Sequence, residues 1–238
     1  MKAVILAGGR GRRLAPYTTV LPKPLMPIGD VPILEVVVRQ LAHAGFGEIT
    51  LAVGYLAELL MAYFGDGGKW GVRIRYSREE RPLGTAGPLA LVEGLDEPFL
   101  AMNGDLLTNL DYRSLWDYHC SHEAVVTMAT YTREVHIDLG IVQVDGQGWV
   151  CDYIEKPTYR HLVSTGIYIF DPAVLRYIPR GEPLDLPDLI RKLLAAGERV
   201  AAYPFEGIWL DIGRPDDYER AVAEFASRRG EFLPEGVL

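Results

Sequence analysis

The first half of the chain alternates short apolar runs with longer amphipathic segments. Runs with the length and composition of buried strands lie at residues 2–7, 48–53, 72–76 and 99–102. Apolar residues at helical spacing fill the segments between them, at residues 33–44, 55–64 and 85–92. Repeated strand and helix units of this length predict a mostly parallel sheet with helices on its faces.

The pattern changes after residue 124. Four strand-like runs follow one another at residues 125–131, 140–144, 150–154 and 163–170. Short turns such as DGQG separate them, which predicts antiparallel hairpins added to the parallel core. Helical patterns complete the chain at residues 172–177, 186–196 and 215–228. We therefore expect an α/β fold with a Rossmann-like, mostly parallel sheet, in a single domain over residues 1–238.

A turn rich in glycine and arginine follows directly on the first strand. Gly8, Gly9 and Gly11 remove side chains where backbone amides would approach an anion, and the neighbouring arginines add positive charge. Lys23 lies between two prolines and is expected on a stiff extended segment. A dinucleotide fingerprint would need glycine in place of Leu14, and no GxxxxGK[ST] run occurs. The turn indicates a phosphate site of another class, with a solvated tight turn as the alternative.

Two aspartates lie at the ends of predicted strands. One strand brings Asn103, Gly104 and Asp105 to the edge of the sheet that also holds the glycine turn, and Asp211 ends a short apolar run. Ligands of open parallel sheets bind at that edge. Because a carboxylate repels a triphosphate unless a cation lies between them, Asp105 fits a ligand of Mg²⁺. A turn or a helix cap is the alternative role for either aspartate.

Charge and composition narrow the function classes. The 238 residues include 24 Lys and Arg against 32 Asp and Glu, a net charge of −8, which argues against nucleic acid or an anionic membrane as a partner. The two cysteines give no disulfide framework, and two reduced thiols are expected. There is neither a basic segment with a long apolar core at the start nor a run of about 18 apolar residues. We expect a cytoplasmic enzyme.

Several motifs occur in an order that resembles one known family. LAGGRGRRL and PKPLMPIGDVPILE are followed by PLGTAG at 82–87, NGD at 103–105, LGIVQVD at 139–145, EKP at 155–157, STGIYIF at 164–170 and WLDIGRPDDY at 209–218. Together they resemble the signature of the sugar-1-phosphate nucleotidylyltransferases, which make nucleotide sugars. The form PLGTAG is most similar to that of the mannose-1-phosphate guanylyltransferases. One departure is Arg12, because the family usually has threonine there.

The resemblance implies roles for individual residues. The catalytic residues it implies are Arg13, Lys23, Asp105, Lys156 and Asp211, of which the two aspartates hold Mg²⁺. The nucleotide contacts it implies are Leu6, Ala7, Gly8, Gly9, Gly11, Arg12, Arg13, Lys23, Glu80, Pro82, Gly84, Thr85, Asn103 and Gly104. The sugar phosphate contacts are Gly140, Glu155, Lys156 and Thr165. Thr85 is also expected to cap the helix that begins beside it.

The substrates implied are a nucleoside triphosphate and a sugar 1-phosphate. A carboxylate at Glu80 would accept hydrogen bonds from guanine, which favours GTP with mannose 1-phosphate or a related hexose or heptose. A UTP- or dTTP-dependent glucose-1-phosphate enzyme is the alternative within the family. Outside it, a glycosyltransferase would usually have DxD where this chain has Asn103, and a silent regulatory subunit would lack the key lysine and aspartates. A monomer and a homo-oligomer both remain open.

Overall fold

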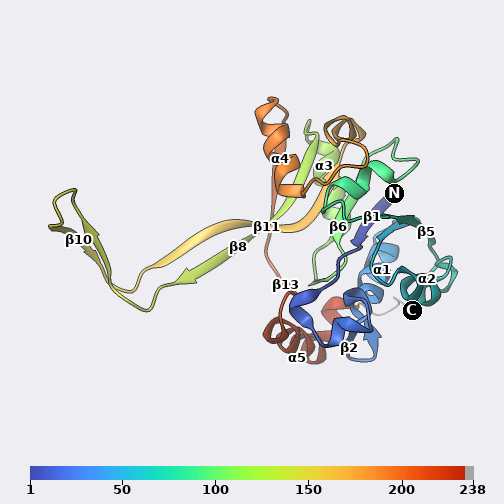
Figure 1. Cartoon of the computed structure of the whole chain (residues 1–238), viewed down its shortest axis with the longest axis horizontal. Coiled ribbons are helices and arrows are strands. Elements are labelled where there is room, and N and C mark those ends of the chain that lie inside the picture. Colours follow the sequence, from blue (N-terminus) through green and yellow to red (C-terminus); the bar gives the residue numbers. More distant parts are fainter. Residues whose placement is uncertain (234–238) are drawn as a thin grey trace.

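A seven-stranded sheet forms the centre of the computed structural model, which describes residues 1–233 (Figure 1). In spatial order its strands are β12 (Val200–Phe205), β8 (Val126–His136), β11 (Thr158–Phe170), β6 (Phe99–Asn103), β1 (Lys2–Ala7), β4 (Glu48–Val53) and β5 (Arg73–Arg78). All neighbours are parallel except β11, which runs antiparallel to both β6 and β8. The predicted mostly parallel sheet with antiparallel additions is confirmed.

Helices pack on both faces of this sheet. One face is covered by α1 (Ile33–His43), α2 (Ala57–Phe64) and α3 (Tyr112–Ser121). The other is covered by α4 (Leu186–Ala195) and the 3-10 helices Gly87–Leu91 and Pro172–Tyr177. Side chains of β1 alternate between the two faces of the sheet. Ala3 and Ile5 pack in the core on the α1 side, and Val4 packs in the core on the α4 side.

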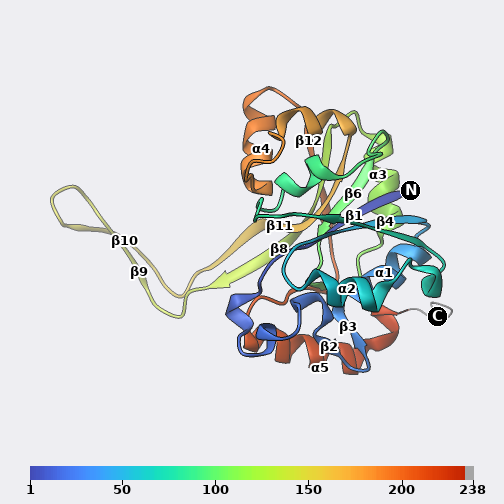
Figure 2. The ribbon, with the colours of Figure 1, turned by 45° about the vertical axis from the view of Figure 1, so that its right-hand side comes forward.

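A third apolar cluster lies below the sheet. There α5 (Pro215–Phe232) packs on β7 (Leu106–Thr108), β13 (Trp209–Asp211) and the short hairpin of β2 (Pro27–Ile28) and β3 (Val31–Pro32) (Figure 2). This packing fixes β13 against β7, next to the end of β6. No helix within residues 1–233 combines the length and the apolar character needed to cross a membrane.

A two-stranded arm projects from the body. The outer halves of β8 and β11 leave the sheet as a paired ribbon, which continues into the hairpin of β9 (Ile141–Val144) and β10 (Val150–Ile154) (Figures 1 and 2). We call residues 132–162 the arm, and residues 137–140 with 155–157 its elbow. At the root, β11 bulges between Ser164 and Tyr168.

Several elements differ from those predicted in their bounds or their type. The strand predicted at 125–131 extends to His136, and the one predicted at 163–170 begins at Thr158. The prediction missed the added residues because they are exposed and carry no burial pattern. The helices predicted at 85–92 and 172–177 are 3-10 helices, at Gly87–Leu91 and Pro172–Tyr177. The strand predicted at 72–76 runs instead from Arg73 to Arg78, which moves its carboxyl end by two residues.

Candidate active site

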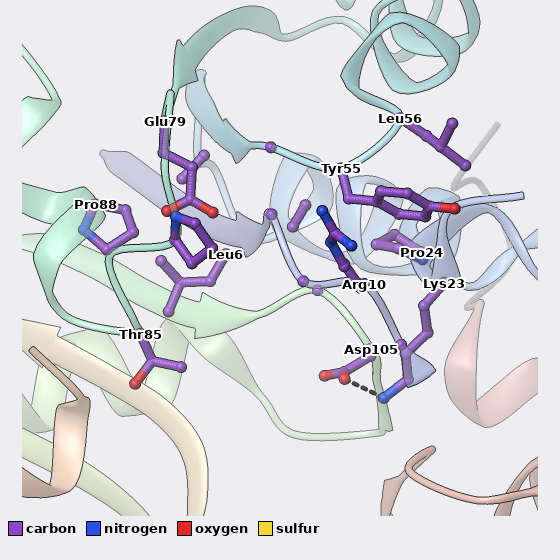
Figure 3. Close-up of a pocket in the computed structure, with 18 of the residues that line it drawn as sticks. Leu6, Arg10, Lys23, Pro24, Tyr55, Leu56, Glu79, Thr85, Pro88 and Asp105 are labelled. Carbon is purple, nitrogen blue, oxygen red and sulfur yellow. Dashed lines mark hydrogen bonds and ion pairs between the residues drawn. The ribbon is translucent and has the colours of Figure 1, made fainter. Parts of the chain in front are cut away.

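A pocket of about 1190 Å³ opens at the carboxyl ends of β1, β4 and β6 (Figure 3). This is the edge at which parallel sheets bind ligands, on the side where the chain order of the strands reverses. Every residue expected from the sequence to contact the nucleotide lines it. These are Leu6, Ala7, Gly8, Gly9, Gly11, Arg12, Arg13, Lys23, Glu80, Pro82, Gly84, Thr85, Asn103 and Gly104.

Two positions of the glycine turn favour glycine, for different reasons. A Cβ on Gly8 would lie 2.4 Å from Glu79 Oε1, so a side chain there would collide with a carboxylate of the pocket wall. Gly11 has φ +59°, in the left-handed region that favours glycine, and begins the 3-10 helix Arg12–Leu14. Gly9 has open space beside it. The turn therefore presents bare backbone to the pocket.

Lys23 and Asp105 form an ion pair at the pocket floor. Lys23 begins the 3-10 helix Lys23–Leu25, so the expectation of an extended segment is wrong and only Pro22 before it is extended. The Lys23 ammonium bonds to Asp105 Oδ2 (Figure 3). Asp105 Oδ1 is buried and has no hydrogen-bond partner within the described chain. One oxygen of this carboxylate thus remains open to a further ligand.

Asp211 lies beside Asp105 although it does not line the pocket itself. It ends β13, opposite Leu106 of β7, and the Ile212 amide donates to Asp105 O at 3.3 Å. Burial and the charge of Asp105 raise the pKa of Asp211, while Lys23 and Arg13 oppose that change. Two neighbouring carboxylates that repel each other fit a cation between them.

Arginines border the same end of the pocket. A Cβ on Gly213 would lie 3.3 Å from Arg13 Nη2, so the guanidinium packs directly on this bare backbone close to Asp211. Arg10 lies over the Tyr55 ring, with 5.6 Å between the guanidinium carbon and the ring centroid (Figure 3). These cations, with Lys23, surround the space next to the glycine turn.

The pocket wall contains a carboxylate that the sequence reasoning missed. Glu79 is half-buried, its Oε2 accepts from the Leu83 amide at 3.0 Å, and burial raises the pKa of its carboxyl. Glu80 also lines the pocket but is exposed. Glu79 is the first residue after β5, so the carboxyl-end rule for parallel strands would have singled it out, had the strand not been ended at Tyr76.

The PLGTAG loop is held by a distant segment. The predicted cap is wrong, because Thr85 leaves the helix beside it without a side-chain cap. Its hydroxyl instead accepts from the Leu186 amide at 2.8 Å, and its own amide donates to Asp185 Oδ1 at 3.0 Å. Gly84 has φ +75°, and a Cβ there would lie 2.6 Å from Leu184 O. The loop is therefore fixed against the start of α4.

The residues expected to hold the sugar phosphate lie elsewhere. Gly140, Glu155 and Lys156 are at the elbow of the arm and do not line the pocket. Thr165 is at the arm's root, buried, with its hydroxyl donating to Ala129 O at 2.8 Å. The structure thus assembles the expected nucleotide residues and separates the expected sugar-phosphate residues from them.

One histidine and both cysteines lie outside the pocket. His119 is buried and its Nδ1 lies 2.8 Å from the Thr127 hydroxyl, so it is a hydrogen-bonded core histidine. Burial lowers its pKa. Cys120 and Cys151 are free and exposed.

Comparison with known proteins gives consistent matches. A family model described as nucleotidyl transferase matches residues 2–228. The chain is 37% identical to a UTP–glucose-1-phosphate uridylyltransferase of Synechocystis, covering 96% of this chain and 64% of that protein. It is 34% identical to a mannose-1-phosphate guanyltransferase of Yarrowia lipolytica, covering 100% and 68%. The chain thus spans about two thirds of the length of these relatives. The crystal structure of HddC from Yersinia pseudotuberculosis matches with a TM-score of 0.72 and 25% identity, covering 94% and 99%.

Proposed function

Because the chain belongs to the sugar-1-phosphate nucleotidylyltransferase family, we propose that it transfers a nucleoside monophosphate from a nucleoside triphosphate to a sugar 1-phosphate. Pyrophosphate is the second product. The observation that carries this proposal is the meeting of the glycine turn, Lys23 and Asp105 in one pocket at the carboxyl end of the sheet. Bare backbone amides and cations are the groups that bind a triphosphate.

The reaction is a single displacement. A phosphate oxygen of the sugar 1-phosphate attacks the α-phosphorus in line, a new P–O bond forms, and the bond to the departing pyrophosphate breaks. Because the attacking oxygen is already an anion, no general base and no covalent enzyme intermediate are required. The protein supplies position and charge. Arg13 and Lys23 stabilise the pyrophosphate, and Lys156 holds the incoming phosphate.

Asp105 and Asp211 would hold Mg²⁺. The open Oδ1 of Asp105 and the repulsion between the two carboxylates fit a cation at this point. Bound there, the ion would neutralise charge on the phosphates. Within residues 1–233 no group of three His, Cys, Asp or Glu side chains is placed to hold a metal, so phosphate oxygens and water would complete the shell. Proteins commonly hold this ion through one or two carboxylates together with substrate phosphates.

GTP is the triphosphate that we favour. Glu79 presents a half-buried carboxylate to the pocket beside Gly8, and Glu80 lies at the rim. A carboxylate can accept from the N1 and N2 hydrogens of guanine together, and no other common base has two adjacent donors on that edge, so such a site discriminates strongly. Mannose 1-phosphate or a related hexose or heptose 1-phosphate is the matching acceptor, by similarity to the guanyltransferase of Yarrowia lipolytica. UTP with glucose 1-phosphate is the second candidate, favoured by the 37% identity to the uridylyltransferase.

A substrate panel tests the proposal. Each nucleoside triphosphate is combined with each of several sugar 1-phosphates, and released pyrophosphate is measured with and without Mg²⁺. We expect release that requires both substrates and the metal, greatest with GTP, and absent in Asp105→Asn. Release without a sugar 1-phosphate, or no release in any combination, would contradict nucleotidyl transfer. Equal turnover with GTP and UTP would contradict only the base assignment.

A further inference from the structure

The elbow of the arm holds a preassembled polar cluster. Lys156 Nζ lies 3.1 Å from Asp138 Oδ1, and the Tyr153 hydroxyl donates to Glu155 Oε2 at 2.9 Å. A Cβ on Gly140 would collide with that hydroxyl oxygen, so glycine leaves room for the tyrosine in this position. Lys156 has φ +41°, which is uncommon outside glycine and concentrates at functional sites. The elbow is therefore a polar cluster joined by its own contacts, although it is open to solvent, with the Lys156 and Asp138 side chains 53% and 79% exposed.

The pocket of one chain lacks this cluster. The cations nearest its two aspartates are Lys23 and Arg13, which the proposed function assigns to the triphosphate. A second phosphate brought beside the first is repelled by it, so it needs positive charge of its own. Lys156 is a cation suited to that task, but it lies outside the pocket. The half of the site that takes the sugar phosphate is thus incomplete in the single chain.

One face of the hairpin is apolar and uncovered. The register pairs Val144 with Val150 and Val142 with Tyr153, and side chains of directly opposed residues lie on the same face. A bulge between Val150 and Asp152 brings Val150 and Tyr153 to one face although they are three residues apart. Each of the four residues is between 50% and 64% exposed. A two-stranded hairpin has little stability of its own in water. A second surface that covered this apolar face would therefore stabilise the hairpin.

The pocket mouth complements the arm in charge. The arm has five acidic and three basic residues, namely Glu134, Asp138, Asp145, Asp152 and Glu155 against Arg133, Lys156 and Arg160. The pocket is lined by six basic and four acidic residues, namely Arg10, Arg12, Arg13, Lys23, Arg78 and Arg81 against Glu58, Glu79, Glu80 and Asp105. Tyr17 and Val20 are exposed and add an apolar surface near the pocket. Their loop is held there because the hydroxyl of Tyr55, which lines the pocket, donates to Thr19 O.

The arm is directed away from the body that carries its own pocket (Figures 1 and 2). The pairing of β8 with β11 runs from Val126 and Phe170 out to His136 and Thr158, and a bulge at the root is its single irregularity. Bringing the elbow onto the same pocket would require this paired ribbon to bend back, whereas it leads outward from the body. A second chain can meet the arm as it stands.

We propose that the arm docks on a second copy of this chain. The apolar hairpin face packs at the mouth of the partner's pocket, and the elbow places Glu155 and Lys156 in that pocket. The contact is reciprocal, so the pair has two-fold symmetry and each complete site contains residues of both chains. The docking is inferred from the apolar face, the charge and the direction of the arm, whereas the role of the elbow lysine rests on the proposed function.

The mass in solution tests the docking without any substrate. We expect light scattering to give about twice the chain mass of 26.5 kDa for the wild type. The double variant Val142→Asp with Val144→Asp should give one chain mass, with an unchanged circular-dichroism spectrum because both residues lie outside the body. Leu194→Asp, an equally drastic change at an exposed leucine of α4, should remain paired. A single-chain wild type, or an arm variant that stays paired, would overturn the proposal.

Mixing two inactive variants tests whether the site is shared. Lys23→Ala damages the pocket and Lys156→Ala damages the elbow, so each alone should be inactive. After subunit exchange of equal amounts, about half of the pairs are mixed and each mixed pair has one complete site, so about a quarter of the wild-type activity should return. No recovery from variants that do exchange would overturn the shared site. A wild type inactive across the substrate panel would overturn the proposed function alone, and the mass measurement would still decide the docking.

Discussion

Replacing Lys23 by methionine should strengthen metal binding and abolish turnover, two effects of opposite sign. The Lys23 ammonium bonds to Asp105 Oδ2, and the two side chains are only 10% and 25% exposed. A hydrogen bond between charged groups contributes about 1.5–3 kcal/mol. Only Oδ1 of Asp105 is open, so a metal that takes both oxygens of this carboxylate must replace the bond from Lys23 to Oδ2. Removing the competing ammonium should therefore tighten metal binding by about 10- to 100-fold, at about 1.4 kcal/mol per factor of ten.

Titration with Mn²⁺ in the absence of nucleotide measures this affinity directly, by the decrease of the free-ion paramagnetic resonance signal. Without metal, Lys23→Met should also unfold at a lower temperature, because Asp105 then has no partner on either oxygen and an unpaired acceptor costs about 1–3 kcal/mol. Added Mn²⁺ should restore the unfolding temperature. Adding Asp105→Asn to the variant is the control, and it should remove the gain in affinity. Unchanged or weaker metal binding in Lys23→Met would refute the competition between lysine and metal.

Other predictions follow from the same site and from the core. Asp105→Ala and Asp211→Ala should each lose most turnover while keeping a native circular-dichroism spectrum, and full activity of either at limiting Mg²⁺ would remove the metal assignment. Glu79→Gln should raise the free energy of unfolding of the ligand-free protein at neutral pH, because burial raises the pKa of this carboxyl and so disfavours its charge in the folded state. That gain should shrink as the pH falls through the raised pKa toward 4.5, and urea titrations showing a growing gain would contradict the burial argument. Burial lowers the pKa of His119 below 6.5, so the unfolded chain takes up the proton first and the wild type should lose stability as the pH falls below 6.5. His119→Gln should flatten that slope, and an unchanged slope would assign the acid sensitivity to other groups.

Local patterns predict the body of the fold and the nucleotide half of the site. Buried parallel strands are continuous apolar runs, so β1, β4 and β6 are visible in the sequence, and their shared carboxyl edge brings the glycine turn to Asp105. Lys23, which lies between two prolines, begins a 3-10 helix and contacts Asp105. This contact joins residues that are far apart in the chain.

Features set by distant contacts or by exposure escape such reasoning. The Thr85 hydroxyl accepts from the Leu186 amide at the start of α4 instead of capping its own helix, and Leu186 lies 101 residues further along the chain. Whether Glu79 or Glu80 is the carboxylate of the pocket wall depends on where β5 ends. The sequence prediction ended this strand two residues too early and therefore missed Glu79. The arm is exposed on both faces, so no burial pattern marks its length or its direction.

Nucleotidyl transfer is tested most directly by locating the bond that breaks. The favoured sugar 1-phosphate is prepared with heavy oxygen between the sugar carbon and phosphorus, and incubated with the favoured triphosphate and Mg²⁺. Phosphorus NMR and mass spectrometry then locate the label in the products. Attack by a phosphate oxygen on the α-phosphorus predicts a nucleotide sugar that keeps all of the label beside the sugar, together with an equal amount of unlabelled pyrophosphate. Loss of the label from the sugar, or formation of no nucleotide sugar by any pair of substrates, would contradict nucleotidyl transfer at this pocket.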